Sequence, residues 1–376
     1  MKRYFRPLVF FMTVVLAACA SLAALSLLSE NHEEKSSVEK DLISCISFSP
    51  DGKKLLFNRR KDGAQNLIHV YDLETGDLAA YQPPAGEKWA MARYSADGES
   101  IVFSVFPEDP LQTGRMQVAI MDADGENVRK ITASDGPKIN PVFSRSGNRI
   151  IFAKGKMREN GRTFAAGFDF YEVDVKTGTE TRLTWFNLYS VSPPCEFPDG
   201  KTLIFGAFGF PGREPGADNA DNVYLAKKGG RGFPRPLVTL GDANPRIHKG
   251  GGARNPLITH DGKKILFQAL AQKPDGRHGE GDQYYQYSPA GTHRRLTNLP
   301  VSTIRSASLS RDGRRLAVVF HPFRAPAHVK KIAVCDIPNG TVRTLNLPEE
   351  PSHLVNRAPH RAIRQEAGAV NGKPGE

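Results

Sequence analysis

The stretch FSPDGKKLLF, residues 48–57, contains two short apolar segments joined by an Asp-Gly turn. Glycine permits the positive φ that a tight hairpin turn requires. Related stretches occur five more times, as YSADGESIVF (94–103), FSRSGNRIIF (143–152), FPDGKTLIF (197–205), THDGKKILF (259–267) and LSRDGRRLAVVF (309–320). The chain of 376 residues is therefore a repeat protein.

The spacing of the repeats indicates the fold. The turn glycines Gly52, Gly98, Gly147, Gly200, Gly262 and Gly313 are 46, 49, 53, 62 and 51 residues apart. A period of about 40–50 residues is typical of a propeller blade with four strands.

Each of these turns is followed by a second hairpin. The six hairpins are HVYDLETGDLAAY (69–81), VAIMDADGENVRKIT (118–132), FYEVDVKTGTETRLT (170–184), VYLAKKGGRGFPRPLV (223–238), YQYSPAGTHRRLT (285–297) and AVCDIPNGTVRTL (333–345). Two hairpins per repeat predict an all-β, six-bladed β-propeller with four antiparallel strands per blade over residues 42–347.

The repeats resemble the TolB-like, WD40-like β-propeller repeats of bacterial envelope proteins. The resemblance is carried by Ser-Pro-Asp-Gly-Lys-Lys at 49–54, Met-Asp-Ala-Asp-Gly at 121–125, and Arg-Leu-Thr at 182–184 and 295–297. It covers about residues 42–347 and implies a propeller fold. These motifs are specific for the fold and do not specify a function.

The N-terminal segment predicts export. Lys2, Arg3 and Arg6 precede the apolar run LVFFMTVVLAACASLAALSLL, residues 8–28. A basic region followed by an apolar run is typical of an export signal. We expect the repeats to lie outside the cytoplasm, in the periplasm or at the cell surface.

Three fates of residues 1–28 stay open. The run is long enough to span a bilayer as an uncleaved anchor, and the small residues around Ala18 and Ala20 allow simple cleavage. Leu16-Ala17-Ala18-Cys19 also resembles a lipoprotein lipobox, in which Cys19 is acylated. An anchor or a lipid would hold the protein at the membrane.

The segments that flank the repeats are polar. Residues 29–41 are predicted to be a polar tether, and residues 348–376 a disordered tail. Cys45 and Cys195 precede their turn glycines by seven and five residues, so that each is expected on an inner strand as a small buried side chain.

The formal charge of +11 lies in the repeats, because residues 1–41 and 348–376 each hold equal numbers of basic and acidic side chains. Such a charge favours anionic partners. An envelope protein, an anionic glycan or a lipid head group fits this charge. No nucleic-acid partner is expected, because export would separate the protein from nucleic acid.

The expected binding surface is the face that carries the long connections between second and third strands and between blades. Long loops on a rigid scaffold are common binding sites. The candidate binding residues on these loops are Arg213, Asp218, Asp221, Arg246, His248, Arg254, His321 and Arg324. The alternative is that these residues are solvated loop side chains that share no site.

Catalytic and metal-binding motifs are missing from the sequence. It contains no His-x-x-x-His pair, no Gly-x-Ser-x-Gly elbow, no calcium-loop spacing and no zinc-ligand spacing. We therefore expect a non-enzymatic binding or scaffold module with no cofactor and no metal. The alternative is a propeller enzyme, a metal-assisted lyase or hydrolase, that uses histidines near the channel mouth such as His248 and His321.

Overall fold

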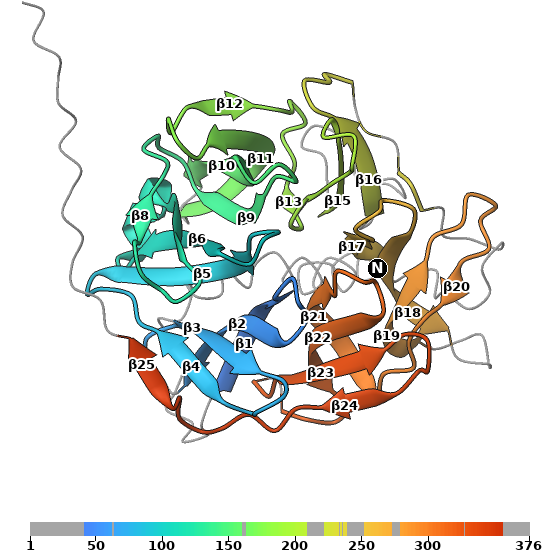
Figure 1. The fold of residues 1–376 in the computed structure, drawn as a ribbon. Coiled ribbons are helices and arrows are strands. Elements are labelled where there is room, and N and C mark those ends of the chain that lie inside the picture. The colour runs from blue at the N-terminus through green and yellow to red at the C-terminus, as the bar shows by residue number, and fades with distance from the viewer. Residues whose placement is uncertain are drawn as a thin grey trace, which may run out of the picture.

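Six β-sheets surround a central axis in the computed structural model of the protein (Figure 1). The structure describes residues 41–61, 64–159, 163–208, 222–232, 234, 236–238, 252–272, 279–326 and 328–355. Each blade is built from four strands that follow one another in the chain and pair antiparallel, in chain order in every blade except blade 4. The predicted six-bladed β-propeller is therefore confirmed.

The blades follow the repeats. Blade 1 contains β1 (Asp41–Phe48), β2 (Lys54–Lys61), β3 (Leu67–Asp72) and β4 (Leu78–Tyr81), and blade 2 contains β5 (Glu87–Tyr94), β6 (Ser100–Pro107), β7 (Gln117–Asp122) and β8 (Arg129–Lys130). Blade 3 contains β9 (Lys138–Phe143), β10 (Arg149–Glu159), β11 (Thr163–Asp174) and β12 (Glu180–Arg182). A short 3-10 helix, η2 (Pro110–Arg115), precedes β7.

The second half of the ring has the same plan. Blade 4 contains β13 (Ser190–Val191), β14 (Cys195–Glu196), β15 (Thr202–Phe208) and β16 (Asn222–Lys227). Blade 5 contains β17 (Ala253–Ile258), β18 (Ile265–Gln272), β19 (Gly279–Gln286) and β20 (Arg294–Arg295). Blade 6 contains β21 (Val301–Leu309), β22 (Arg315–Pro322), β23 (Lys331–Asp336) and β24 (Val342–Thr344).

The repeated Ser-x-Asp-Gly turn joins the first two strands of a blade. In blade 1 the Ser49 hydroxyl donates to the Asp51 carboxylate at 2.6 Å, and Gly52 has φ +72°. The Ser49 amide donates to the Lys54 carbonyl at 2.9 Å, which closes the hairpin. The same hydroxyl-to-carboxylate bond occurs at Ser95, Thr259 and Ser310. We call the face that carries these turns the turn face and the opposite face the loop face.

A phenylalanine at the end of each quoted repeat packs the blades together. These side chains are buried, and they are Phe57, Phe103, Phe152, Phe205, Phe267 and Phe320. Each belongs to an apolar cluster shared with the preceding blade, as Phe205 does with Phe170 of blade 3 at 4.8 Å between ring centroids. Phe57 of blade 1 packs against Ile332 of blade 6. The ring is thus closed by the same contact that joins every other pair of blades.

Blade 4 departs from the pattern. Its inner strand is split into β13 and β14 at Ser192-Pro193-Pro194, because proline has no backbone N–H to donate to a strand ladder. At the place of its fourth strand, the described residues form a bridge between Tyr224 and Pro236, and the Leu237 amide donates to the Val223 carbonyl at 2.7 Å.

The prediction of a disordered tail from residue 348 is wrong for residues up to 355. β25 (His353–Val355) pairs in parallel with β4, so that the end of the described chain lies beside the first blade (Figure 1). The Ser352 amide also donates to the Leu78 carbonyl at 2.7 Å. The outer edge of β4 presents backbone groups that need partners, and the segment supplies them.

The predicted export segment and most of the tether, residues 1–40, lie outside the described residues, as does the chain after residue 355. In the part of the chain that the structure describes, no helix has the length and apolar character needed to cross a membrane.

Candidate functional site

A cavity of about 630 Å³ lies among the first strands of the blades. Residues from β1, β5, β9, β13, β14, β17 and β21 line it, so that every blade contributes. The cavity is therefore the central channel of the propeller. Its volume is within the range of about 300–1,000 Å³ that is usual for small-molecule sites.

Each first strand bends where it borders the channel. In four blades the residue seven positions before the turn glycine has positive φ, namely Cys45, Met91, Asn140 and Asn255. The strand pairing shifts register at the same points. Asparagine tolerates this conformation well, whereas side chains such as Met91 adopt it at a cost of about 1–3 kcal/mol. Such strain is concentrated at functional sites in proteins.

Basic side chains dominate the charge of the channel. Among the described residues that line the cavity, five are lysine or arginine, namely Arg60, Arg93, Arg145, Arg305 and Lys330. Glu196 is the single acidic residue among them. Low-dielectric walls of one charge sign concentrate counter-ions, so that the channel attracts anions.

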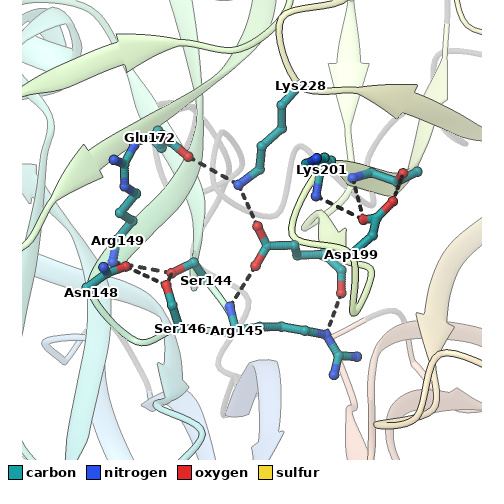
Figure 2. Close-up of polar contacts among 11 residues, drawn as sticks. Ser144, Arg145, Ser146, Asn148, Arg149, Glu172, Asp199, Lys201 and Lys228 are labelled. Carbon is teal, nitrogen blue, oxygen red and sulfur yellow. Dashed lines mark hydrogen bonds and ion pairs between the residues drawn. The ribbon is translucent and has the colours of Figure 1, made fainter.

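The charge of Glu196 is already neutralised by the protein. Its carboxylate accepts from the Lys228 ammonium at 2.5 Å and from the Arg145 backbone N–H at 2.6 Å. Lys228 also contacts Glu172 at 3.2 Å, and Glu172 pairs with Arg149. Figure 2 shows Lys228 reaching Glu172 of β11, and its second contact, with Glu196 of β14, connects blades 3 and 4. Among the described residues that line the cavity, Glu196 therefore offsets little of the positive charge.

Hydrogen bonds cross the channel at the turn face. Arg145 of blade 3 donates to the His260 carbonyl of blade 5 at 2.5 Å. Arg311 of blade 6 donates to the Ala96 carbonyl of blade 2 at 3.1 Å and lies 3.4 Å from the His260 ring nitrogen Nε2. Burial and the two nearby guanidinium groups lower the pKa of His260. These bonds form a floor across the turn-face end of the cavity.

Two channel arginines each have a buried polar atom without a hydrogen-bond partner in the part of the chain that the structure describes. Arg93 donates through Nη1 to the Ile46 carbonyl at 3.0 Å, but its buried Nε has no partner among the described residues. The buried Nε of Arg305 likewise has none. Burial, and then the charge of Arg305, lower the pKa of Lys330 to about 8. Buried unsatisfied donors are rare in proteins, so that these two are candidates for contact with a ligand.

Five of the residues predicted to bind, Arg213, Asp218, Asp221, Arg246 and His248, lie outside the described residues, as does Cys19. The remaining three are in blades 5 and 6, and none of them lines the cavity. Arg254 pairs with Asp282 at 3.2 Å, the His321 Nδ1 lies 2.9 Å from the Val329 carbonyl, and Arg324 is exposed. The predicted group of loop residues stays a prediction.

The channel residues were not predicted as a site. Arg93 and Arg305 lie five and eight residues before a turn glycine, within strands that border the axis. A charged residue at such a position in a first strand is the signal that identifies them. Cys45 and Cys195 are on the expected inner strands, but both are half-buried and line the channel.

Within the described residues no group of three or more His, Cys, Asp or Glu side chains comes together to bind a metal ion. The described residues of the channel offer hydrogen-bond donors and positive charge to a ligand.

No family model matches the chain. Solved structures similar to it include an oligogalacturonate lyase in complex with manganese, at 16% identity and a TM-score of 0.53, which covers 81% of this chain and 77% of the lyase. A puromycin hydrolase matches at 14% identity and a TM-score of 0.51, over 86% of this chain and 54% of the hydrolase. TolB from Acinetobacter baumannii matches at 21% identity and a TM-score of 0.48, over 79% of this chain and 70% of TolB.

These structures correct one prediction. The expectation that the protein is not an enzyme is contradicted, because the similar propellers include a lyase and a hydrolase. The absence of catalytic motifs from the sequence was a poor guide to enzymatic activity, because a propeller can assemble a site from residues on different blades that are far apart in sequence. The expected six-bladed propeller fold is confirmed by the topology of the sheets.

Proposed function

We propose that this protein is an exported propeller whose central channel binds an anionic ligand of the cell envelope. One observation carries the proposal, namely five basic residues and one neutralised acid around a cavity of about 630 Å³. Arginine is well suited to this role because its planar donors match carboxylate and phosphate oxygens.

The direction of entry follows from the channel floor. Arg145, His260 and Arg311 join blades across the turn-face end. A ligand therefore enters from the loop face, where the candidate binding loops of the sequence also begin. The anionic group belongs to a glycan, a lipid head group or an envelope protein.

Binding is tested with the full chain and a panel of anions comprising trigalacturonate, pyrophosphate and octanoate. We expect at least one to bind, and Arg93→Gln/Arg305→Gln to weaken its binding at least tenfold by calorimetry. The matched control is Lys227→Gln/Lys263→Gln, which removes two cations whose side chains are 69% and 81% exposed. Equal weakening by both double variants, or no binding of any anion, would contradict the proposal.

The same incubations are analysed for new products by chromatography and mass spectrometry, because similar propellers include a lyase and a hydrolase. Product formation that depends on Arg93 and Arg305 would show that the channel transforms its ligand as well as binding it.

The envelope location rests on residues 2–28 and needs its own test. We expect the protein to fractionate outside the cytoplasm. If Cys19 is the acylated residue, Cys19→Ser blocks maturation and globomycin causes the precursor to accumulate. Normal maturation of the variant would exclude lipidation at Cys19, and recovery in the cytoplasm would contradict export.

A further inference from the structure

The charged residues of the channel are not distributed evenly around it. Arg305 and Lys330 belong to blade 6, Arg60 to blade 1 and Arg93 to blade 2. These blades are neighbours, because β1 packs between β21 and β5. Four of the five cations therefore form one continuous side of the channel, which we call the cationic wall, and the fifth, Arg145 of blade 3, lies in the floor.

The cationic wall is held rigidly by bonds between its strands. On one side of β1, the Ile46 amide donates to the Ser306 hydroxyl of β21 at 3.1 Å. On the other side of β1, the Ile46 carbonyl accepts from Arg93 of β5 at 3.0 Å. Such preorganisation lowers the conformational entropy that the protein loses when a ligand binds.

Blades 3, 4 and 5 form the opposite side, which we call the apolar wall. Its hydrocarbon side chains are Val142, Val191, Pro193, Pro194, Pro256 and Leu257. The side-chain amides of this wall already have partners, because Asn140 donates to the Val191 carbonyl at 2.9 Å and Asn255 donates to the Gln268 side chain at 2.7 Å. This wall presents mainly hydrocarbon to a ligand above the floor.

We propose that the channel ligand is an amphipathic organic acid, with its anionic group against the cationic wall and its hydrocarbon part against the apolar wall. This inference rests on the proposed anion binding and specifies the ligand class. A ligand that carries hydroxyl groups on all sides, such as an oligouronate, would place some of them against Pro193, Pro256 and Leu257, where they lose hydrogen bonds to water without replacement.

The test uses water-soluble probes and calorimetry on the full chain. Butanoate, hexanoate and octanoate vary the hydrocarbon part, hexyltrimethylammonium reverses the charge, and trigalacturonate is an anion without a hydrocarbon part. We expect carboxylate affinity to rise up to about fourfold for each added methylene, because each is transferred from water to an apolar surface. Octanoate should bind at least tenfold more tightly than hexyltrimethylammonium.

Two variants assign the binding to the walls. Arg305→Gln should weaken octanoate binding about tenfold. Val142→Thr/Leu257→Asn, which keeps the number and branching of the side-chain heavy atoms, should remove most of the dependence on chain length. All variants share the same N-terminal segment, so that any binding by that segment cancels in the comparison. Circular dichroism verifies that each variant is folded, and retained binding of butanoate verifies the site in the apolar-wall variant.

The outcomes separate this inference from the proposed function. Channel binding of trigalacturonate without binding of octanoate would overturn the amphipathic ligand and support anion binding. Octanoate binding that is insensitive to Arg305→Gln would overturn the inference as well, because it would indicate adsorption outside the channel. Failure of every anion would overturn both proposals.

Discussion

The boundary between blades 3 and 4 and the cationic wall of blades 6, 1 and 2 use similar side chains in different ways. At the boundary the basic groups alternate with carboxylates, as Figure 2 shows for Arg149, Glu172 and Lys228. In the cationic wall, Arg93 and Arg305 have no carboxylate partner among the described residues.

The difference distinguishes a structural cation from a cation that is available to a ligand. Removing one member of a buried ion pair leaves the other charge without compensation, which is strongly destabilising. Removing a cation that has no acidic partner leaves no such charge behind. The same kind of substitution should therefore lower the free energy of unfolding strongly at the boundary and hardly change it in the cationic wall.

The largest effect is expected from Lys228→Ala, which removes the cation shared by Glu172 and Glu196. The Lys228 side chain is 16% exposed and that of Glu196 is 4% exposed, so that water replaces little of the lost interaction. We expect the free energy of unfolding to fall by about 3 kcal/mol. Urea denaturation followed by circular dichroism measures this change.

The neighbouring residue provides a matched control. Lys227 pairs with Asp199 at 3.2 Å, but its side chain is 69% exposed. Lys227→Ala should therefore change the free energy of unfolding by less than about 1 kcal/mol. Similar effects of the two substitutions would show that the network at the boundary of blades 3 and 4 is not a structural one.

A smaller effect on the free energy of unfolding is expected from the protonation of His69, a buried side chain with a lowered pKa. His69 stacks on Phe57 with 5.6 Å between the ring centroids. Burial, and to a smaller extent the charge of Arg59, lowers the pKa of His69 to about 4. Between pH 6.5 and 4 the unfolded chain binds a proton that the folded chain does not bind. Stability from this residue is therefore present above pH 6.5 and falls as the pH falls toward 4.

We expect this contribution to be about 2–3 kcal/mol, from the usual 1.36 kcal/mol per pKa unit. Unfolding curves at pH 7 and pH 4.5 for the protein and for His69→Phe measure it. Carboxylates contribute to acid unfolding in both proteins, so that the difference between them isolates His69. Parallel losses of stability in the two proteins would rule out a neutral His69 in the fold.

The fold was predictable from the sequence because its determinants are local and repeated. The turn glycines with positive φ, the Ser-x-Asp-Gly hydrogen bonds and the buried phenylalanines all lie within single repeats. β25 was missed because three residues that extend a sheet edge carry no apolar repeat of their own.

The channel site was harder to predict because its residues come from different blades. Arg93 and Arg305 both line the cavity although they are far apart in sequence. Which side chains turn inward depends on the bend in each first strand. The repeat identifies the strands that border the axis, but the register shifts decide which residues face the cavity. Loop length pointed to the loop face, whereas the described site lies within the strands.

The smallest effect on stability is expected from Arg305→Gln in the cationic wall. Arg305 has a buried Nε without a partner and lies close enough to Lys330 to lower its pKa. Loss of this charge should leave the free energy of unfolding within about 0.5 kcal/mol of the original value, because relief of repulsion offsets lost packing. The pKa of Lys330 should rise from about 8, which an NMR titration of the lysine side chain measures with Lys330→Arg as the assignment control. A loss of stability as large as that expected for Lys228→Ala would place Arg305 among the structural cations, and the contrast between the two regions would then disappear.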